Sequence, residues 1–419
     1  MLIQFNFENY KSFRGEASLD LSATNITEFS ERVVKKGGEK ILPVAVIYGP
    51  NASGKSNVYS AFAYMSKYVL NSFKYGDDGK EYDEVRPSPF LFDSETEKKD
   101  TTFEVYFTIL KDQLEYVYNY GFCLGIEGVT EEWLNYRAAN SEKSKTIFYR
   151  DHDDLDLSGI SKESRDNIKI ALEPEVLITS LGAKLKINEC KIVRDWFKEN
   201  EFADFGNAVS NFFLSRMLPP GFVEDASVQD NVVNFFSSFD DQIKGFEVTK
   251  VPSSDDDKKA ERYTIDALHK KLNSEELAKI PLSSESAGTL KMFALYSELQ
   301  SVLKKGSILF VDELNARLHP LLVRNIILTF CNPKVNVNNA QLIFTTHDTW
   351  QLSNQLLRRD EIWFTEKDKN GVSTLYSLVD FVDEKGTRIR KDESYEKNYL
   401  LGKYGAIPTL NNIGLLEEN

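Results

Sequence analysis

The stretch "LPVAVIYGPNASGKSN", residues 42–57, joins a short apolar run to a glycine-rich turn and a helix start. A short, fully apolar run is typical of a strand that is buried on both faces. From Lys55, apolar residues recur at helical spacing between Val58 and Phe73, which predicts a helix of about five turns. This order places the turn at the end of a buried strand and against the N-terminus of a helix.

The turn "GPNASGKS", residues 49–56, matches the phosphate-binding loop, in which a glycine and four residues precede Gly-Lys-Ser. Two glycines allow the tight backbone path that points successive N–H groups at phosphates. We expect Lys55 to contact the β- and γ-phosphates of ATP and Ser56 to bind Mg²⁺. A chance match is the alternative, but the flanking strand and helix provide the context that the motif requires. The predicted nucleotide-binding residues are Gly49, Pro50, Asn51, Ala52, Ser53, Gly54, Lys55, Ser56 and Asn57.

Two adjacent acids end another apolar run, "SILFVDELNARLHP", residues 307–320. If this run is a neighbouring strand of the same sheet, Asp312 can reach the Mg²⁺ held by Ser56. Glu313 can then accept a proton from the water that attacks the γ-phosphate. A pair of solvated acids at a strand end is the alternative reading.

Two further segments fit a nucleotide site. In "QLIFTTHD", residues 341–348, His347 follows an apolar strand and can contact the γ-phosphate, although a single His there is more often structural. In "LSSESAGTLKMF", residues 282–293, Ser286 and Gly288 precede a helix whose N-terminus can bind an anion. A helix cap formed by Ser286 or Thr289 has the same geometry without a ligand.

The remaining segments indicate an α/β fold. Residues 1–22 predict two strands joined by a turn, and residues 101–150 predict an antiparallel meander. Residues 160–245 are mainly helical in character, and 253–261 is an acidic stretch expected to form a turn between strands. Helix and strand patterns alternate from residue 280, which favours a parallel sheet covered by helices. The expected nucleotide-binding domain, or head, has an N-terminal part (1–150) and a C-terminal part (251–419). A helical insertion or lid (151–250) is expected between them.

Composition restricts the class of protein. The 419 residues are 41% hydrophobic and 28% charged, as in folded globular proteins. The apolar runs are far shorter than the ~20 residues of a membrane-spanning helix. Three cysteines (Cys123, Cys190, Cys331) lack metal-ligand or disulfide spacing, and the N-terminus lacks a signal-peptide pattern. We therefore expect a cytoplasmic protein without membrane contact.

The net charge of −14 argues against strong nonspecific nucleic-acid binding, because that affinity comes from cations that displace counterions. Direct contact with nucleic acid is expected to be weak. The C-terminal stretch "GTRIRKDESYEKNYLLGKYG", residues 386–405, mixes five basic residues with acids, and a solvated surface segment is the favoured interpretation. Its basic residues are Arg388, Arg390, Lys391, Lys397 and Lys403.

The order of these motifs resembles the ABC-type ATPases of the structural-maintenance, RecF and OLD branch. The segments "MLIQFNFENYKSF", "FDDQIKGFEV" and "EKNYLLGKYGAIP" also resemble the bacterial AAA-family "ATP/GTP-binding protein" group. That group includes abortive-infection (AbiL-type) ATPases, which are often paired with a RloB-type nuclease-like protein. The resemblance implies an ABC-ATPase head with a mixed or parallel phosphate-loop sheet, an antiparallel β-subdomain and a helical insertion.

The resemblance also implies roles for individual residues. Two heads would enclose two ATP molecules, so that Ser286 and Gly288 of one head meet the γ-phosphate bound by the other. Glu313 would be the catalytic glutamate and His347 the switch histidine. Asn315 and Arg317 would belong to the loop that crosses the dimer, where the family usually has aspartate and serine; this departure suggests slow or activated hydrolysis.

Three functions remain open at this stage. The first is a regulatory ATPase of antiviral defence, dimeric or larger when ATP is bound, that controls a nuclease or toxin-like effector. The second is a RecF- or SMC-like repair ATPase that binds DNA itself, but the chain lacks a long coiled coil. The third is a P-loop kinase or GTPase, for which no guanine-reading motif is found; "EKDKNG", residues 366–371, fits a hairpin turn better.

Overall fold

The computed structural model describes residues 1–75, 85–139, 141–207, 209–210, 217–237, 241–251, 262–382 and 386–408. The turn expected at 253–261 lies outside these residues. None of the helices in the described part of the chain is long and apolar enough to span a membrane.

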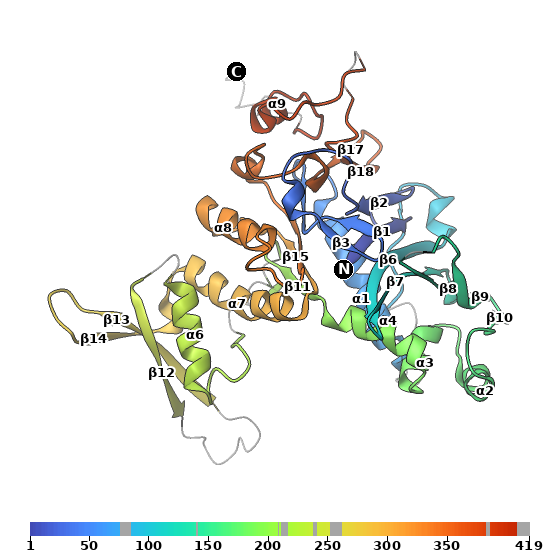
Figure 1. The fold of residues 1–419 in the computed structure, drawn as a ribbon, viewed down its shortest axis with the longest axis horizontal. Helices are drawn as coiled ribbons and strands as arrows, with labels where there is room; N and C mark the ends of the chain where they lie inside the picture. The colour runs from blue at the N-terminus through green and yellow to red at the C-terminus, as the bar shows by residue number, and fades with distance from the viewer. Residues whose placement is uncertain are drawn as a thin grey trace, which may run out of the picture.

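A mostly parallel sheet forms the centre of the fold (Figure 1). Its strand order is β11-β15-β16-β5-β17-β18, and every neighbouring pair is parallel except β17 and β18. The strands are β5 (Val44–Tyr48), β11 (Glu201–Asp204), β15 (Ile308–Asp312), β16 (Gln341–Thr345), β17 (Ile362–Lys367) and β18 (Ser373–Ser377). The predicted parallel sheet is confirmed, and so is the hairpin turn between β17 and β18.

Helices cover both faces of this sheet because successive side chains of a buried strand point to opposite faces. Ile47 and Phe310 belong to one hydrophobic core, together with residues of α1 (Lys55–Asn71). Val46 and Val311 belong to the other, together with α7 (Ala287–Lys305) and α8 (Pro320–Cys331). The helix predicted after the phosphate-binding loop is confirmed, although it ends at Asn71 and Phe73 lies in a following 3₁₀ turn.

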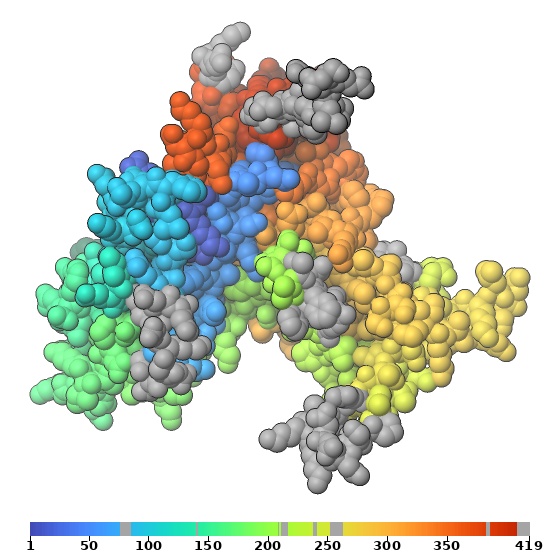
Figure 2. Space-filling view, turned by 180° about the vertical axis from the view of Figure 1, so that it is seen from behind, coloured from blue at the N-terminus to red at the C-terminus, as the bar shows by residue number. Residues whose placement is uncertain are grey.

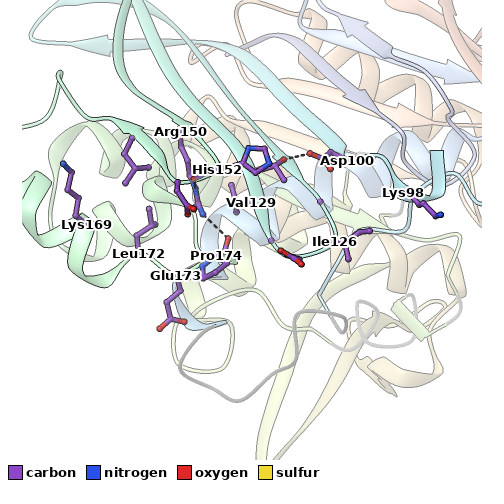
Figure 3. A pocket seen from close by; sticks show the side chains of 16 residues that line it. Lys98, Asp100, Ile126, Val129, Arg150, His152, Lys169, Leu172, Glu173 and Pro174 are labelled. Carbon is purple, nitrogen blue, oxygen red and sulfur yellow. Dashed lines mark hydrogen bonds between the residues drawn. The ribbon is translucent and has the colours of Figure 1, made fainter. Parts of the chain in front are cut away.

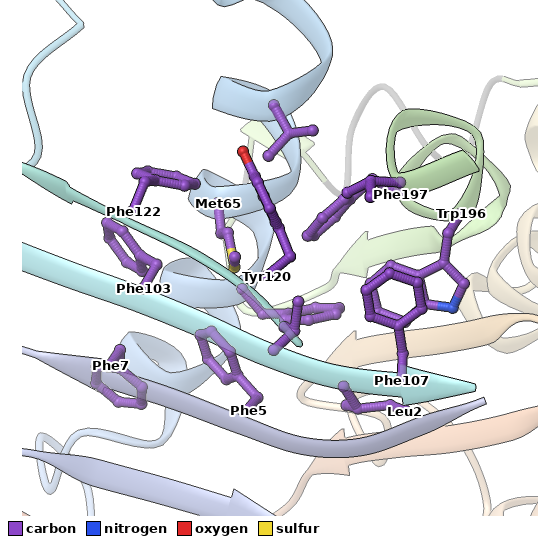
Figure 4. Close-up of a cluster of buried hydrophobic side chains, with 14 of the residues drawn as sticks. Leu2, Phe5, Phe7, Met65, Phe103, Phe107, Tyr120, Phe122, Trp196 and Phe197 are labelled. Carbon is purple, nitrogen blue, oxygen red and sulfur yellow. The ribbon is translucent and has the colours of Figure 1, made fainter. Parts of the chain in front are cut away.

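An antiparallel sheet packs against the first core. Its strand order is β10-β9-β8-β7-β6-β1-β2, which confirms the predicted N-terminal strand pair and the meander. Its strands are β1 (Leu2–Glu8), β2 (Ala17–Asp20), β6 (Thr101–Lys111), β7 (Leu114–Leu124), β8 (Val129–Ala138), β9 (Lys145–Asp151) and β10 (Asp154–Asp156). Aromatic side chains fill the space between this sheet and the helices (Figure 4), and the rings of Phe107 and Trp196 stack with centroids 4.2 Å apart.

The segment expected to be a helical insertion contains helices and also strands. Within its described residues, the helices are α2 (Lys162–Ala171), α3 (Ile178–Lys184), α4 (Asn188–Glu199) and α6 (Ala226–Phe236). The strand β11 joins the central sheet beside β15, and the sequence analysis did not predict it. The reason is physical: four residues, "EFAD", are too few to show strand periodicity among helical neighbours.

A smaller lobe extends from the body of the molecule (Figures 1 and 2). It contains α6 and a three-stranded antiparallel sheet of β12 (Ile243–Val251), β13 (Arg262–Lys270) and β14 (Leu277–Pro281). The chain passes from β14 directly into α7, so the helix that begins at the Ser286 motif connects the lobe to the central sheet. The short ribbon β3 (Val34–Lys36) and β4 (Glu39–Ile41) and the helix α9 (Tyr395–Leu400) complete the fold.

One buried side chain links the two large sheets. The amide of Gln341, at the start of β16, is 1% exposed. Its Oε1 accepts a hydrogen bond from the Leu2 N–H at 2.6 Å, and its Nε2 donates to the carbonyls of Leu2 (2.9 Å) and Leu42 (3.0 Å). The side chain thus supplies hydrogen-bond partners to backbone groups of β1 and of the segment that leads into β5.

We predict that Gln341→Leu lowers the free energy of unfolding by about 3 kcal/mol, because buried backbone groups lose their partners. Urea unfolding followed by circular dichroism measures the change. The same substitution at the exposed Gln355 is the control and should leave the midpoint nearly unchanged. Equal midpoints for the two variants would contradict the structural role of Gln341.

Candidate active site

The phosphate-binding loop has a backbone path that requires glycine. Gly54 has φ +115°, and a Cβ atom there would lie 2.7 Å from the Ser373 hydroxyl. A Cβ atom on Gly49 would clash with the carbonyl oxygen of Thr365. Both glycines of the motif are therefore needed to bring the loop against β17 and β18.

Two of the residues predicted to bind nucleotide have side chains that brace the loop. The Ser53 hydroxyl lies 2.6 Å from that of Thr365, and Ser373 donates to the Ser53 carbonyl at 2.7 Å. The Asn57 amide donates to the Ser12 hydroxyl at 2.7 Å. These contacts with β17, β18 and the turn after β1 hold the loop in one conformation.

The N-terminus of α1 differs from those of α7 and α8. Ser286 caps α7 and His319 caps α8, whereas no side chain caps α1. Uncapped N–H groups at a helix N-terminus are suited to bind an anion. The phosphate-binding loop leads directly into this end of α1, as the motif requires.

Lys55 lies at the centre of the loop and is 4% exposed. Its ammonium group donates to the carbonyls of Gly49 (2.9 Å) and Pro50 (3.0 Å). Burial lowers the pKa of Lys55 to about 8, and the charges of Glu313 and Asp312 oppose this shift. The lysine and the two acids are distant in sequence, and their electrostatic interaction indicates that the fold brings them near one another.

Ser56 lies close enough to Asp312 to influence its carboxyl group. A hydrogen bond from Ser56 is one of the interactions that lower the pKa of the Asp312 carboxyl, whereas burial, the largest effect, raises it. Asp312 Oδ1 also accepts a hydrogen bond of 2.5 Å from the hydroxyl of Thr345 on β16. A hydroxyl and a carboxylate, both oxygen ligands, thus face one another where Mg²⁺ is expected.

Glu313 contacts His347, the residue predicted to sense the γ-phosphate. Glu313 Oε1 lies 3.0 Å from His347 Nε2, and the Glu313 N–H donates to Thr345 Oγ1 at 2.9 Å. The hydrogen bond with His347 is the main cause of the lowered pKa of Glu313, and burial opposes it. A lowered pKa keeps the carboxylate ionised but weakens it as a proton acceptor.

The turn after Glu313 packs against both the β16 end and α7. The side-chain oxygen of Asn315 accepts hydrogen bonds from the Thr346 hydroxyl (2.9 Å) and the His347 N–H (3.4 Å). Arg317 is exposed, and a Cβ atom on Gly288 would lie 3.1 Å from the Arg317 carbonyl oxygen. Gly288 therefore has a packing role within its own chain, in addition to any role toward a nucleotide.

Ser286 is exposed at the N-terminus of α7, where its hydroxyl accepts a hydrogen bond of 3.1 Å from the Thr289 N–H. The preceding residue, Glu285, pairs with His269 of β13 at 2.7 Å. The structure therefore brings the Ser286 motif to the Arg317 turn and to the lobe, and it gives the motif the helix-cap geometry that the sequence allowed.

Sequence reasoning missed two charged residues near Asp312. Asp204 ends β11 in register with Asp312, and its charge is one of the effects that raise the pKa of Asp312. Lys11 follows β1; burial lowers its pKa, while the charges of Asp204 and Asp312 oppose this. Asp204 is a polar residue at the end of a strand, which is the pattern that identified Asp312 and His347. It was missed because β11 itself was not predicted.

The donor set suits a Mg²⁺ that is shared with a nucleotide. Within the described part of the chain, no group of three or more His, Cys, Asp or Glu side chains forms a metal cage. Mg²⁺ commonly takes only one or two carboxylates and completes its shell with phosphate oxygens and water. Ser56 and Asp312, with Asp204 beside them, fit that pattern.

A separate pocket of about 690 Å³ lies beside β9 and α2 (Figure 3). Arg150, which lines it, is 5% exposed and donates to the carbonyls of Val176 (2.9 Å) and His152 (3.2 Å). The guanidinium group therefore joins β9 to neighbouring chain segments. The phosphate-binding loop does not line this pocket, and neither do Asp312, Glu313 and His347.

Comparison with known proteins agrees with this geometry. A family model described as "AAA domain, putative AbiEii toxin, Type IV TA system" matches residues 44–349, which is more than half of the chain. The matched range begins at β5 and ends just after His347. A search of curated proteins found no match.

We predict that the affinity for ATP falls as the pH is raised through about 8. Above the pKa of Lys55 the ammonium group loses its proton, and binding that requires this charge weakens by up to about tenfold per pH unit. Calorimetric titration with ATP at pH 7, 8 and 9 measures the trend. Lys55→Ala should bind ATP weakly at every pH and fold normally; wild-type affinity in that variant would contradict the assignment.

Proposed function

The chain belongs to the family of AAA domains described as "putative AbiEii toxin, Type IV TA system", and from this premise we propose that it binds and hydrolyses ATP as an ABC-type dimeric ATPase. Its membership places it in the P-loop class of ATPases. Hydrolysis, ATP-dependent dimerisation and the roles of individual residues are the content of the proposal.

One observation carries the proposal: Lys55, Ser56, Asp312, Glu313 and His347 converge at one edge of the central sheet. His347 pairs with Glu313, the charges of Glu313 and Asp312 act on the pKa of Lys55, and Ser56 is among the groups that lower the pKa of Asp312. Enzymes that transfer a phosphoryl group to water use such groups: a cation, a hydroxyl, a pair of carboxylates and an imidazole.

The chemistry assigns a task to each group. Lys55 and the N-terminus of α1 would bind the phosphates, and Ser56 and Asp312 would hold the metal, with Asp204 beside Asp312. Mg²⁺, when bound, neutralises charge on the phosphate oxygens. Glu313 orients the attacking water and accepts its proton.

The Glu313–His347 contact suggests how Glu313 is restrained as a base until a γ-phosphate is in place. His347 lowers the pKa of Glu313, so the carboxylate is a weaker base while this hydrogen bond lasts. A γ-phosphate within reach of His347 competes for the same imidazole. When His347 turns to the phosphate, Glu313 becomes free to act on water.

The position of the Ser286 motif supports the proposed dimerisation. Ser286 is exposed, so its side of the motif is available to a second copy. Gly288 packs on the Arg317 turn of its own chain. In the proposed dimer the motif meets the γ-phosphate bound by the second copy. Asn315 and Arg317 lie on the adjacent turn, at the same face.

For the biological role we propose a regulator in prokaryotic antiviral defence that controls a nuclease or toxin-like effector when ATP is bound. The support is the toxin–antitoxin description of the family and the resemblance to abortive-infection ATPases. The lobe formed by α6 and β12–β14 is a suitable place for an effector to act, because it leads directly into α7.

We predict that Glu313→Gln lowers kcat by about 10²- to 10⁴-fold, because the amide cannot accept the proton, while ATP still binds. Retained ATP should then stabilise the dimer through contacts of about 1.5–3 kcal/mol each. Size-exclusion chromatography with light scattering should show a larger species for Glu313→Gln with ATP than for the wild type alone. Adding Ser286→Arg should return it to the smaller species. Wild-type hydrolysis by Glu313→Gln, or assembly that ignores ATP, would disprove the mechanism.

We predict that the protein alone binds random duplex DNA no tighter than about micromolar at physiological salt. The net charge is −14, and basic residues of the C-terminal segment are engaged by acids, Arg390 with Asp392 and Lys403 with Glu393. Fluorescence anisotropy with a labelled random duplex measures the affinity. Nanomolar binding would favour a DNA-repair ATPase instead.

A further inference from the structure

A buried lysine on α7 has no part in the chemistry described above. Lys291 is 2% exposed and lies on the apolar stripe of the helix, in line with Leu295, Leu299 and Val302. A lysine in such a stripe is unusual, since burial of a charge costs free energy unless the charge is satisfied. Its partners therefore indicate why the charge is there.

The ammonium group of Lys291 is satisfied by backbone carbonyls of the turn after β15. It donates to the carbonyl oxygens of Glu313 (3.2 Å), Leu314 (2.8 Å) and Ala316 (2.9 Å), which uses its three donors. The same ammonium lies 3.9 Å from the centre of the Phe205 ring, at the end of β11. One side chain thus contacts the strand ends that carry Asp204 and Glu313.

The turn that Lys291 holds has a backbone that needs support. Glu313 has φ +58° and Arg317 has φ +62°, left-handed conformations that are uncommon for residues other than glycine. Such conformations persist when surrounding contacts fix them. The three carbonyls that accept from Lys291 lie within this turn.

We propose that Lys291 is a positioning residue for hydrolysis: from α7 it fixes the turn that aims the Glu313 carboxylate at the attacking water. Lys291 does not touch the substrate and acts through Glu313. The contact also connects the Ser286 motif to Glu313, because α7 begins at that motif. In the proposed dimer the Ser286 motif meets the second copy. A shift of α7 on dimerisation is therefore transmitted to Glu313.

The inference rests on the proposed ATPase function, and its test separates the two. Lys291→Met keeps the length of the side chain and removes all three donors. We expect kcat to fall about 10²-fold, since misplacement of a catalytic group by about 1 Å has that effect. The dissociation constant for ATP, measured by calorimetry, should stay within about twofold, because the phosphate-binding loop is untouched.

A control on the same helix separates positioning from general stability. Val302→Ala, roughly 16 Å further along α7, creates a cavity in the same core and should lower the melting temperature without lowering kcat. Lys291→Gln keeps an amide donor without the charge, so it is the gentler variant should Lys291→Met fail to fold, and it should give an intermediate kcat with unchanged ATP affinity.

The outcomes divide clearly. A kcat of Lys291→Gln or Lys291→Met within about twofold of the wild type, or an equal loss in Val302→Ala, overturns the inference and leaves the ATPase function standing. A wild type that binds ATP without hydrolysing it overturns the proposed function together with the inference. A selective loss of kcat in the Lys291 variants supports both.

Discussion

The candidate site depends on the parallel register of β11, β15, β16 and β5. In parallel strands the carboxyl ends meet at one edge, so the residue that follows the last apolar position of each strand arrives at the same place. Asp204, Asp312 and the phosphate-binding loop are collected in this way, and Thr345 of β16 lies between them. The hydrogen bonds of Thr345 to Asp312 and Glu313 then hold the acids in a fixed relation.

The second constraint is the helix α7, which contacts both the lobe and the turn after β15. Its first residues adjoin the lobe through the Glu285–His269 pair, and Gly288 packs on the Arg317 carbonyl. One turn further, Lys291 reaches the carbonyls after Glu313. A partner that acts on the lobe therefore has a short and rigid connection to the residues proposed for hydrolysis.

The fold was predictable where periodicity is strong and the element is long. The helix after Lys55, the alternation of helix and strand from residue 280 and the antiparallel meander all follow from apolar spacing. The four-residue strand β11 did not, because so short a run carries no period, and with it Asp204 escaped notice. Lys291 stood in the sequence as a lysine on an apolar stripe, but its partners are backbone carbonyls, which no sequence motif displays.

The sequence by itself determined the chemistry that is available: a phosphate-binding loop, two acids after a strand, and a histidine after the next. Each of these follows from local residue types, because a glycine-rich turn between strand and helix has few other uses. Only the tertiary structure decided how they contact one another. The Thr345–Asp312 bond, the Glu313–His347 pair and the Lys291 contacts join residues distant in the chain, and their distances are set by strand register and helix packing. Strand register and helix packing depend on side chains throughout the folded core. No single segment of the sequence therefore determines them.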